Sequence, residues 1–357
     1  MTDTILVGLN DRSYPITIGD NVWSKVVPYL ETRLFTSSMT VIDQRVDSLY
    51  GERFFPIIDQ MGKPGFRYIV PEGEKSKSFE FLESICQNMA KSGMDRDSLV
   101  LAVGGGVVGD LAGLAASVYL RGVRLIQLPT TLLSMVDSSV GGKTGINIPE
   151  GKNLVGTFYQ PEAVFADTSV LSTLHERDWY SGLAEVVKIA LTLDAGLFSY
   201  LESVADLGPT GDLDVIRIVG AACRRKAEVV ELDEREADLR KALNFGHTLG
   251  HGVEAALGYG ILRHGEAVVL GMKAALNLSV KLCGLPGDQL QRAVNLLNRI
   301  PVPEVGIPVD LARFIVRDKK SSGNTITGVL ISKIGKHEFV ALEDPAVLVE
   351  ALRGRNL

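Results

Sequence analysis

The sequence predicts an α/β protein in which a parallel-sheet domain is followed by a mainly α-helical domain. The chain has 357 residues, a length for which two domains are the usual arrangement. Its first half alternates short apolar runs with helical patterns, whereas long amphipathic segments dominate after about residue 175. We place the boundary within residues 160–173, which gives domains of residues 1–170 and 171–357.

The strands of the first domain are predicted from short apolar runs, as expected for strands covered on both faces. Helical patterns lie between them, so the order is strand, helix, strand, helix, which is typical of a parallel sheet. A further strand at 163–166 precedes the boundary. We expect the other strands at 40–43, 66–70, 98–103 and 123–128, and helices at 78–91 and 107–117.

The second domain is predicted to be built mainly from long helices. Apolar residues recur there with helical spacing over four segments, and a β-hairpin is expected around Gly335. The helices are expected at 178–193, 212–232, 245–257 and 266–283, and the hairpin strands at 325–334 and 337–342.

Composition excludes several classes of protein. The chain is 46% hydrophobic and 22% charged, which is ordinary for a globular protein with a sizeable core. Its formal charge of -6 argues against a nucleic-acid partner. Cys86, Cys223 and Cys283 are odd in number and far apart, so we expect no disulfide framework and a reducing cytoplasm. No signal peptide or membrane span is expected.

A glycine-rich turn follows the strand predicted at 98–103. Gly104, Gly106 and Gly109 have the spacing of a dinucleotide fingerprint and lead into a helix, whose N-terminus can bind a pyrophosphate. This context predicts a Rossmann-like nucleotide-binding domain. Asp43, at the end of an earlier strand, is our candidate for the ribose. The alternatives are a tight packing turn for the glycines and a solvated turn for Asp43.

Polar residues also follow the strand at 123–128. Residues 128–147 contain several hydroxyls together with Asp137 and Lys143, and Lys152 and Asn153 come soon after. Side chains of this kind at the carboxyl end of a strand favour ligand contacts.

Three of the five histidines lie close together in the sequence. His247 and His251 are four residues apart and can share one helix face, and His264 follows shortly. Neutral imidazole is the commonest protein ligand for zinc. With Arg240, Asn244 and Glu266 nearby, the cluster indicates metal or phosphate chemistry. The alternatives are a hydrogen-bonded core cluster or a helix cap.

Glu185 and Lys188 lie one helical turn apart within a strongly apolar run. An exposed ion pair at this spacing contributes only about 0.2–0.5 kcal/mol to stability. The apolar surroundings predict burial instead, and a buried carboxylate needs a partner such as a metal. Glu185 with two histidines would form a zinc site.

Seven blocks, in the same order and across nearly the whole chain, resemble the 3-dehydroquinate synthase family of sugar-phosphate cyclases. The blocks are residues 71–77, 104–110, 129–147, 151–154, 182–188, 243–251 and 264–266. The resemblance implies an NAD- and metal-dependent enzyme of the shikimate pathway that converts 3-deoxy-D-arabino-heptulosonate 7-phosphate (DAHP) into 3-dehydroquinate and phosphate. It also implies an N-terminal nucleotide-binding domain, a helical metal-binding domain and a homodimer.

The resemblance also implies roles for individual residues. It makes Glu185, His247 and His264 the ligands of zinc or cobalt, with His251 on the substrate side. The chain departs from the family pattern at Gly252, where alanine is more common. The residues implied for substrate are Asp137, Lys143, Lys188, Lys226, Arg240, Asn244, His251 and Lys319, with Arg121 reaching a neighbouring subunit's phosphate. Those implied for NAD are Asp43, Glu74, Lys77, Gly105, Gly106, Val107, Asp110, Thr130, Thr131, Lys152 and Asn153.

Three other functions compete with this one. A sister sugar-phosphate cyclase would keep the NAD and metal residues but act on a different phosphorylated sugar. A metal-dependent polyol dehydrogenase with the same two-domain plan would release NADH. A non-catalytic nucleotide-binding module would not need the metal residues. Gly141, Gly142 and Lys143, together with Arg240, Asn244 and His251, match the synthase set.

Overall fold

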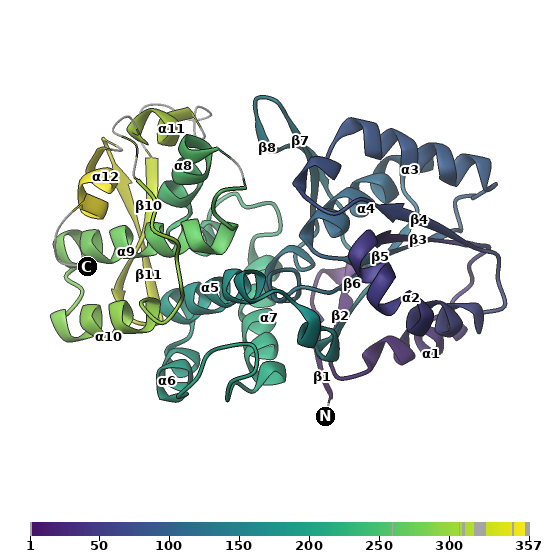
Figure 1. The fold of residues 1–357 in the computed structure, drawn as a ribbon, viewed down its shortest axis with the longest axis horizontal. Coiled ribbons are helices and arrows are strands. Elements are labelled where there is room, and N and C mark those ends of the chain that lie inside the picture. The colour runs from purple at the N-terminus through teal and green to yellow at the C-terminus, as the bar shows by residue number, and fades with distance from the viewer. Residues whose placement is uncertain are drawn as a thin grey trace. The chain divides into compact units, whose positions relative to one another are not determined.

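The structure is a computed structural model that describes residues 2–258, 260–306, 308, 311–317, 326–344 and 346–353. The chain divides into two compact units (Figure 1). Unit 1 comprises Met1–Leu174 and Val215–Glu231, and unit 2 comprises His175–Asp214 and Leu232–Leu357. Each unit is described by itself.

Unit 1 is built around a seven-stranded sheet of order β1-β2-β9-β6-β5-β3-β4. β1 and β2 pair antiparallel, and the remaining neighbours pair parallel. All residues of β5, an interior strand of the sheet, are buried, which explains why it is apolar throughout. The strands are β1 (Thr2–Val7), β2 (Tyr14–Gly19), β3 (Ser38–Asp43), β4 (Gly65–Val70), β5 (Leu99–Gly104), β6 (Arg124–Pro129) and β9 (Ala163–Asp167).

Helices cover both faces of this sheet (Figure 1). On one face, the core joins Val41 and Val100 of the sheet to Ile85 of α3 and Leu111 of α4. A separate hairpin, β7 (Lys143–Ile148) with β8 (Gly151–Phe158), packs on α4. The helices are α1 (Val26–Glu31), α2 (Gln44–Asp59), α3 (Phe79–Lys91), α4 (Gly106–Val118) and α7 (Val215–Leu232).

Unit 2 is mainly helical. α5 and α9 form its centre, because the residues of α5 from Ser181 to Thr192 are all buried. A hairpin of β10 (Ile326–Lys333) and β11 (Lys336–Leu342) packs against α9, and Gly335 makes its turn at φ 83°. The helices are α5 (Glu176–Leu193), α6 (Ala195–Ser203), α8 (His247–Leu257), α9 (His264–Cys283), α10 (Gly287–Leu297), α11 (Leu311–Arg317) and α12 (Ala346–Arg353).

The predicted fold class is confirmed, and each predicted strand of the parallel sheet lies within two residues of an observed one. Two strand pairs, β1–β2 and β7–β8, were not expected. α7 belongs to unit 1, although its sequence falls within the predicted helical domain of residues 171–357. Its contacts explain this, since Arg224 pairs with Asp3 at 2.8 Å and Cys223 Sγ lies 3.2 Å from the carbonyl oxygen of Met135.

Among the residues described, no helix is both long enough and apolar enough to cross a membrane.

Candidate active site

The glycine-rich turn of unit 1 joins β5 directly to α4. A Cβ atom added at Gly104 would lie 2.8 Å from the Cβ of Val108 and 3.3 Å from that of Asp43. One added at Gly105 would lie 3.1 Å from Cγ2 of Thr131. The chain therefore needs glycine here to pack this closely. The N-terminus of α4, a helix end that suits an anion such as a phosphate, follows at once.

Asp43 ends β3, beside the glycine turn. Its carboxylate caps α2, because Oδ1 accepts hydrogen bonds from the backbone N–H groups of Arg45 at 2.8 Å and Val46 at 3.2 Å. Burial raises the pKa of Asp43, and the two backbone bonds only partly oppose it. Asp43 thus lies at the sheet edge where a ribose partner is expected, while also holding a helix end.

A polar network brings four of the predicted NAD residues together. Lys77 is 4% exposed, and its Nζ donates to Oδ2 of Asp110 at 2.7 Å and contacts Oδ1 of Asn153. Asn147 joins them, since its side chain donates to Glu74 Oε1 at 2.8 Å and accepts from the Asn153 backbone at 2.9 Å. Burial raises the pKa of Asp110, and the Lys77 ammonium opposes that rise.

A second polar cluster joins α7 to the segment that follows β6. Lys226 is 5% exposed, its Nζ contacts the Asp137 carboxylate, and it also donates to the Asp137 carbonyl at 2.7 Å. Directly after β6, the backbone N–H of Thr130 donates to the Gly104 carbonyl at 3.0 Å. The structure therefore pairs two residues predicted to contact substrate.

In unit 2, three helices bring the predicted metal ligands together. α5 carries Glu185, α8 begins at His247 and α9 begins at His264. Gly265 lets α9 approach α5, since a Cβ there would lie 2.2 Å from the carbonyl oxygen of Ser181. Its backbone N–H donates to Ser181 Oγ at 2.9 Å.

The approach of α8 to α9 depends on glycine as well. A Cβ at Gly271 would lie 1.9 Å from the carbonyl oxygen of Gly246. Glu266 fixes the start of α9, because its carboxylate accepts from the Arg263 backbone at 2.7 Å and from Arg177 at 2.7 Å.

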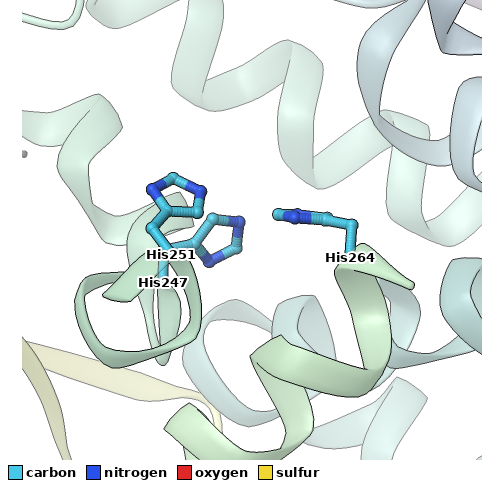
Figure 2. Close-up of side chains that lie close together, drawn as sticks. All are labelled: His247, His251 and His264. Carbon is cyan, nitrogen blue, oxygen red and sulfur yellow. The ribbon is translucent and has the colours of Figure 1, made fainter. Parts of the chain in front are cut away.

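The side chains of His247, His251 and His264 lie close together (Figure 2). Oε1 of Glu185 lies 3.7 Å from Nε2 of His247 and 3.6 Å from Nε2 of His264. The ring nitrogens of His247, His251 and His264 also lie within 4.8 Å of one another. One carboxylate with two imidazoles is a donor set that zinc accepts, so these residues fit a divalent metal.

The two proposed imidazole ligands are held at their other ring nitrogen. Nδ1 of His247 lies 3.2 Å from the Phe245 carbonyl, and Nδ1 of His264 lies 3.2 Å from Oε2 of Glu254. Burial lowers the pKa of His247 well below its usual value, and nearby Lys188 lowers it further. Burial also acts to lower the pKa of His264, but Glu185 and Glu254 outweigh it and raise that pKa to about 10.

Glu254 is a residue that the sequence interpretation did not single out. It lies seven residues after His247 on α8, hence on the same helix face, and this spacing was its one available signal.

The predicted burial of Glu185 and Lys188 is confirmed. Glu185 is 0% exposed and Lys188 is 2% exposed, and Nζ of Lys188 contacts Oε2 of Glu185. The ammonium of Lys188 therefore lies next to Glu185, one of the predicted metal ligands.

Arg240 and Asn244 are oriented by the loop that precedes them. Arg240 is 2% exposed, and its Nη1 donates to the Glu234 carbonyl at 2.6 Å. The Asn244 side chain donates to Glu236 at 2.8 Å. Oδ2 of Asp233 accepts the Arg240 backbone N–H at 3.0 Å, which folds the loop back on itself.

Two other predicted residues lie on exposed parts of unit 1. Arg121 ends the short 3-10 helix Tyr119–Arg121 at φ 69°, and Lys143 is exposed at the start of β7. Lys319 lies outside the described residues.

Comparison with known proteins places both halves of the chain in one family. The family model described as 3-dehydroquinate synthase N-terminal matches residues 67–181, and the one described as 3-dehydroquinate synthase C-terminal matches residues 182–321. A 3-dehydroquinate synthase from Geobacter metallireducens is 43% identical over 357 residues, which covers 98% of this chain and 98% of the relative.

Two solved structures are similar over almost the whole chain. A 2-deoxy-scyllo-inosose synthase with carbaglucose-6-phosphate, NAD+ and Co2+ has a TM-score of 0.90 at 26% identity, covering 98% of this chain and 99% of its own. The 2-epi-5-epi-valiolone synthase of Streptomyces hygroscopicus, with NAD+ and Zn2+ bound, has a TM-score of 0.86 at 29% identity, covering 97% of each chain. With both halves matched by its models, the chain belongs to the 3-dehydroquinate synthase family.

Proposed function

We propose that the protein is a phosphorus–oxygen lyase that converts DAHP into 3-dehydroquinate and phosphate, using NAD and a divalent metal. The observation that carries this proposal is the convergence of Glu185, His247 and His264 in a chain that also has a strand–glycine–helix turn. A nucleotide-binding module alone would not need the first feature. The family membership supports the same conclusion.

Bound NAD+ would supply a hydride acceptor that returns the hydride in the same turnover, and a bound metal would lower the pKa of a substrate hydroxyl. Phosphate would leave by elimination, and ring opening followed by an intramolecular aldol closure would complete the carbocycle. The protein's own contribution is to hold one substrate conformer and to balance its charges.

We assign the anionic groups of the substrate to basic side chains. Arg240 offers a planar fork that suits two oxygens of a phosphate or carboxylate, and its loop contacts hold that fork in place. Lys188 and Lys226 are each held against a carboxylate, so their positions are defined before substrate binds. The full proposed substrate set is Asp137, Lys143, Lys188, Lys226, Arg240, Asn244, His251 and Lys319, with Arg121 acting across a homodimer.

For NAD we propose the residues around the glycine turn and the Lys77 network. The Cβ positions at Gly105 and the contacts of Lys77 support this assignment. The full proposed set is Asp43, Glu74, Lys77, Gly105, Gly106, Val107, Asp110, Thr130, Thr131, Lys152 and Asn153. We further propose a cytoplasmic homodimer that acts in the shikimate pathway without a nucleic-acid or membrane partner.

The test is to offer the purified protein DAHP or the phosphorylated sugars of the sister cyclases, each with NAD+ and Zn2+. Phosphate release and the mass of the product are measured. We expect 3-dehydroquinate from DAHP and no cyclised product from the others. Turnover of another sugar phosphate in place of DAHP would instead assign the protein to a sister cyclase.

A further inference from the structure

Glu254 is a buried carboxylate to which neither the family resemblance nor the proposed function assigns a role. It is 5% exposed and lies on α8, two helical turns after His247. Burying a carboxylate costs free energy unless hydrogen bonds or opposite charge compensate it. Its Oε2 lies 3.2 Å from Nδ1 of His264, the first residue of α9, so the contact bridges two helices.

The contact involves the ring nitrogen of His264 that does not face Glu185. Nε2 of the same ring lies 3.6 Å from Oε1 of Glu185, on the side where the proposed ligands converge. Glu254 is therefore behind the imidazole and is not itself a ligand. When the Nδ1–H group of His264 donates a hydrogen bond to Oε2 of Glu254, Nε2 carries the free lone pair. That lone pair is then the one available to a metal.

His247 has a corresponding bond made by the backbone. Its Nδ1 lies 3.2 Å from the carbonyl oxygen of Phe245, while its Nε2 lies 3.7 Å from the same Oε1 of Glu185. Both imidazoles are thus held at Nδ1 and turned with Nε2 toward one carboxylate oxygen. The difference is that a side-chain substitution can remove the bond to His264 but not the bond to His247.

We propose that Glu254 is a positioning residue that orients His264 and fixes its Nδ1–H tautomer for metal binding. This inference rests on the metal assignment within the proposed function. Carboxylates that hold a ligating histidine in this way typically contribute about 10- to 100-fold to metal affinity. A solely structural Glu254 would instead stabilise the packing of α8 on α9 and leave the affinity of the folded protein unchanged.

The test measures metal binding without substrate, using Co2+ alone and then Zn2+ in competition with a chelator. Glu254→Ala removes the bond, whereas Glu254→Gln keeps the shape and an amide oxygen that can still accept from Nδ1. We expect Glu254→Ala to weaken metal binding about 10- to 100-fold, with Glu254→Gln between it and the parent. The visible absorption of bound Co2+ should change in the alanine variant, because the imidazole is no longer held.

Ser279→Ala is the matched control for lost stability. Ser279 lies on the same helix as His264, is 0% exposed, and its Oγ accepts the Ile331 backbone N–H at 3.0 Å. This variant should lower the unfolding temperature of the metal-free protein without changing metal affinity or the Co2+ spectrum. Parent-like affinity and spectrum in both Glu254 variants would overturn the inference and leave the metal assignment intact. A parent that binds no Co2+ or Zn2+ would overturn both.

Discussion

Among single residues, the three clustered histidines His247, His251 and His264 have the same side chain but different proposed roles. Nε2 of His264 and of His247 both face Glu185, whereas His251 follows one helical turn later on α8. We therefore predict that His264→Ala folds but loses bound zinc and activity. His251→Ala should keep its zinc and lose activity. Metal content is measured on the purified proteins. Zinc loss in the His251 variant alone would make His251 the metal ligand and His264 the substrate-side residue.

A second prediction concerns the buried guanidinium of Arg240. Lysine keeps the charge but cannot reproduce the planar fork or the bond to the Glu234 carbonyl. Arg240→Lys should lower kcat/KM for DAHP by about one to two decades, as expected when a charge-assisted contact worth roughly 1.5–3 kcal/mol is lost. Zinc content and NAD+ affinity should stay at the parent level.

Arg235→Lys is the control, because Arg235 is exposed on the same loop. Parent-like turnover by Arg240→Lys would remove Arg240 from the proposed substrate set.

The burial of a side chain could be predicted from the sequence where its residue type is unusual for its surroundings. Glu185 and Lys188 are charged within an apolar run, and this contrast alone predicted their burial. Glu254 could not be found in this way, because glutamate is ordinary on a helix and its partner His264 lies on a different helix. Which acid faces an imidazole depends on how α8 packs on α9, and helical periodicity does not determine that packing.

At the scale of elements, the start of α9 depends on the absence of a side chain at residue 265. Gly265→Ala would place a Cβ 2.2 Å from a backbone oxygen of α5, so the two helices must separate. We predict a loss of stability of about 1–3 kcal/mol, as for overpacked cores, together with weaker zinc binding. Thermal unfolding and metal titration measure the two effects.

The matched control is Gly287→Ala at the first position of α10, where an added Cβ meets nothing within 4 Å. Alanine favours helix over glycine, so this variant should be as stable as the parent or slightly more stable. Equal behaviour of the two variants would show that the contact between α5 and α9 does not depend on Gly265.

The loop before Arg240 predicts a pH dependence. Burial would raise the pKa of Asp233, but backbone N–H groups of Arg240, Asp238 and Ala237 lower it below its usual value. A folded-state pKa below the unfolded one means that the carboxylate stabilises the fold above the usual carboxyl pKa. That stabilisation is lost as the pH falls through the folded-state pKa.

Asp233→Asn should therefore be less stable than the parent at pH 7, by about 1 kcal/mol for one lost hydrogen bond, and the difference should shrink in acid. Urea unfolding of both proteins at pH 7 and at acidic pH measures this difference in the free energy of unfolding. Asp238→Asn is the control, because the Asp238 side chain is 92% exposed. A stability difference independent of pH would contradict the role given to the Asp233 carboxylate.

The elements predicted best are those buried on two faces or along a clear helical stripe. β5 is buried along its whole length, and its apolar run located it to within one residue. The hairpin strand β8 was missed because it is largely exposed and its residues, from Gly151 to Phe158, show no apolar alternation. α7 was correctly predicted as a helix. Its apolar periodicity indicates that one face is buried, but it does not indicate which unit covers that face.

For the molecule as a whole, the proposed function requires unit 1 to bind the nucleotide and unit 2 to bind the metal for one reaction. The glycine turn and the Lys77 network lie in unit 1, and the Glu185 cluster lies in unit 2. A polyol dehydrogenase would have the same division of tasks. The two functions differ in what happens to the hydride, because only the cyclase returns it within the turnover.

The most direct test follows phosphate release and NADH absorbance together in one reaction containing the protein, DAHP, Zn2+ and NAD+. We expect one phosphate per DAHP consumed, with no net NADH and with NAD+ needed only in catalytic amounts. Stoichiometric NADH without phosphate release would contradict the proposed function and would favour a dehydrogenase.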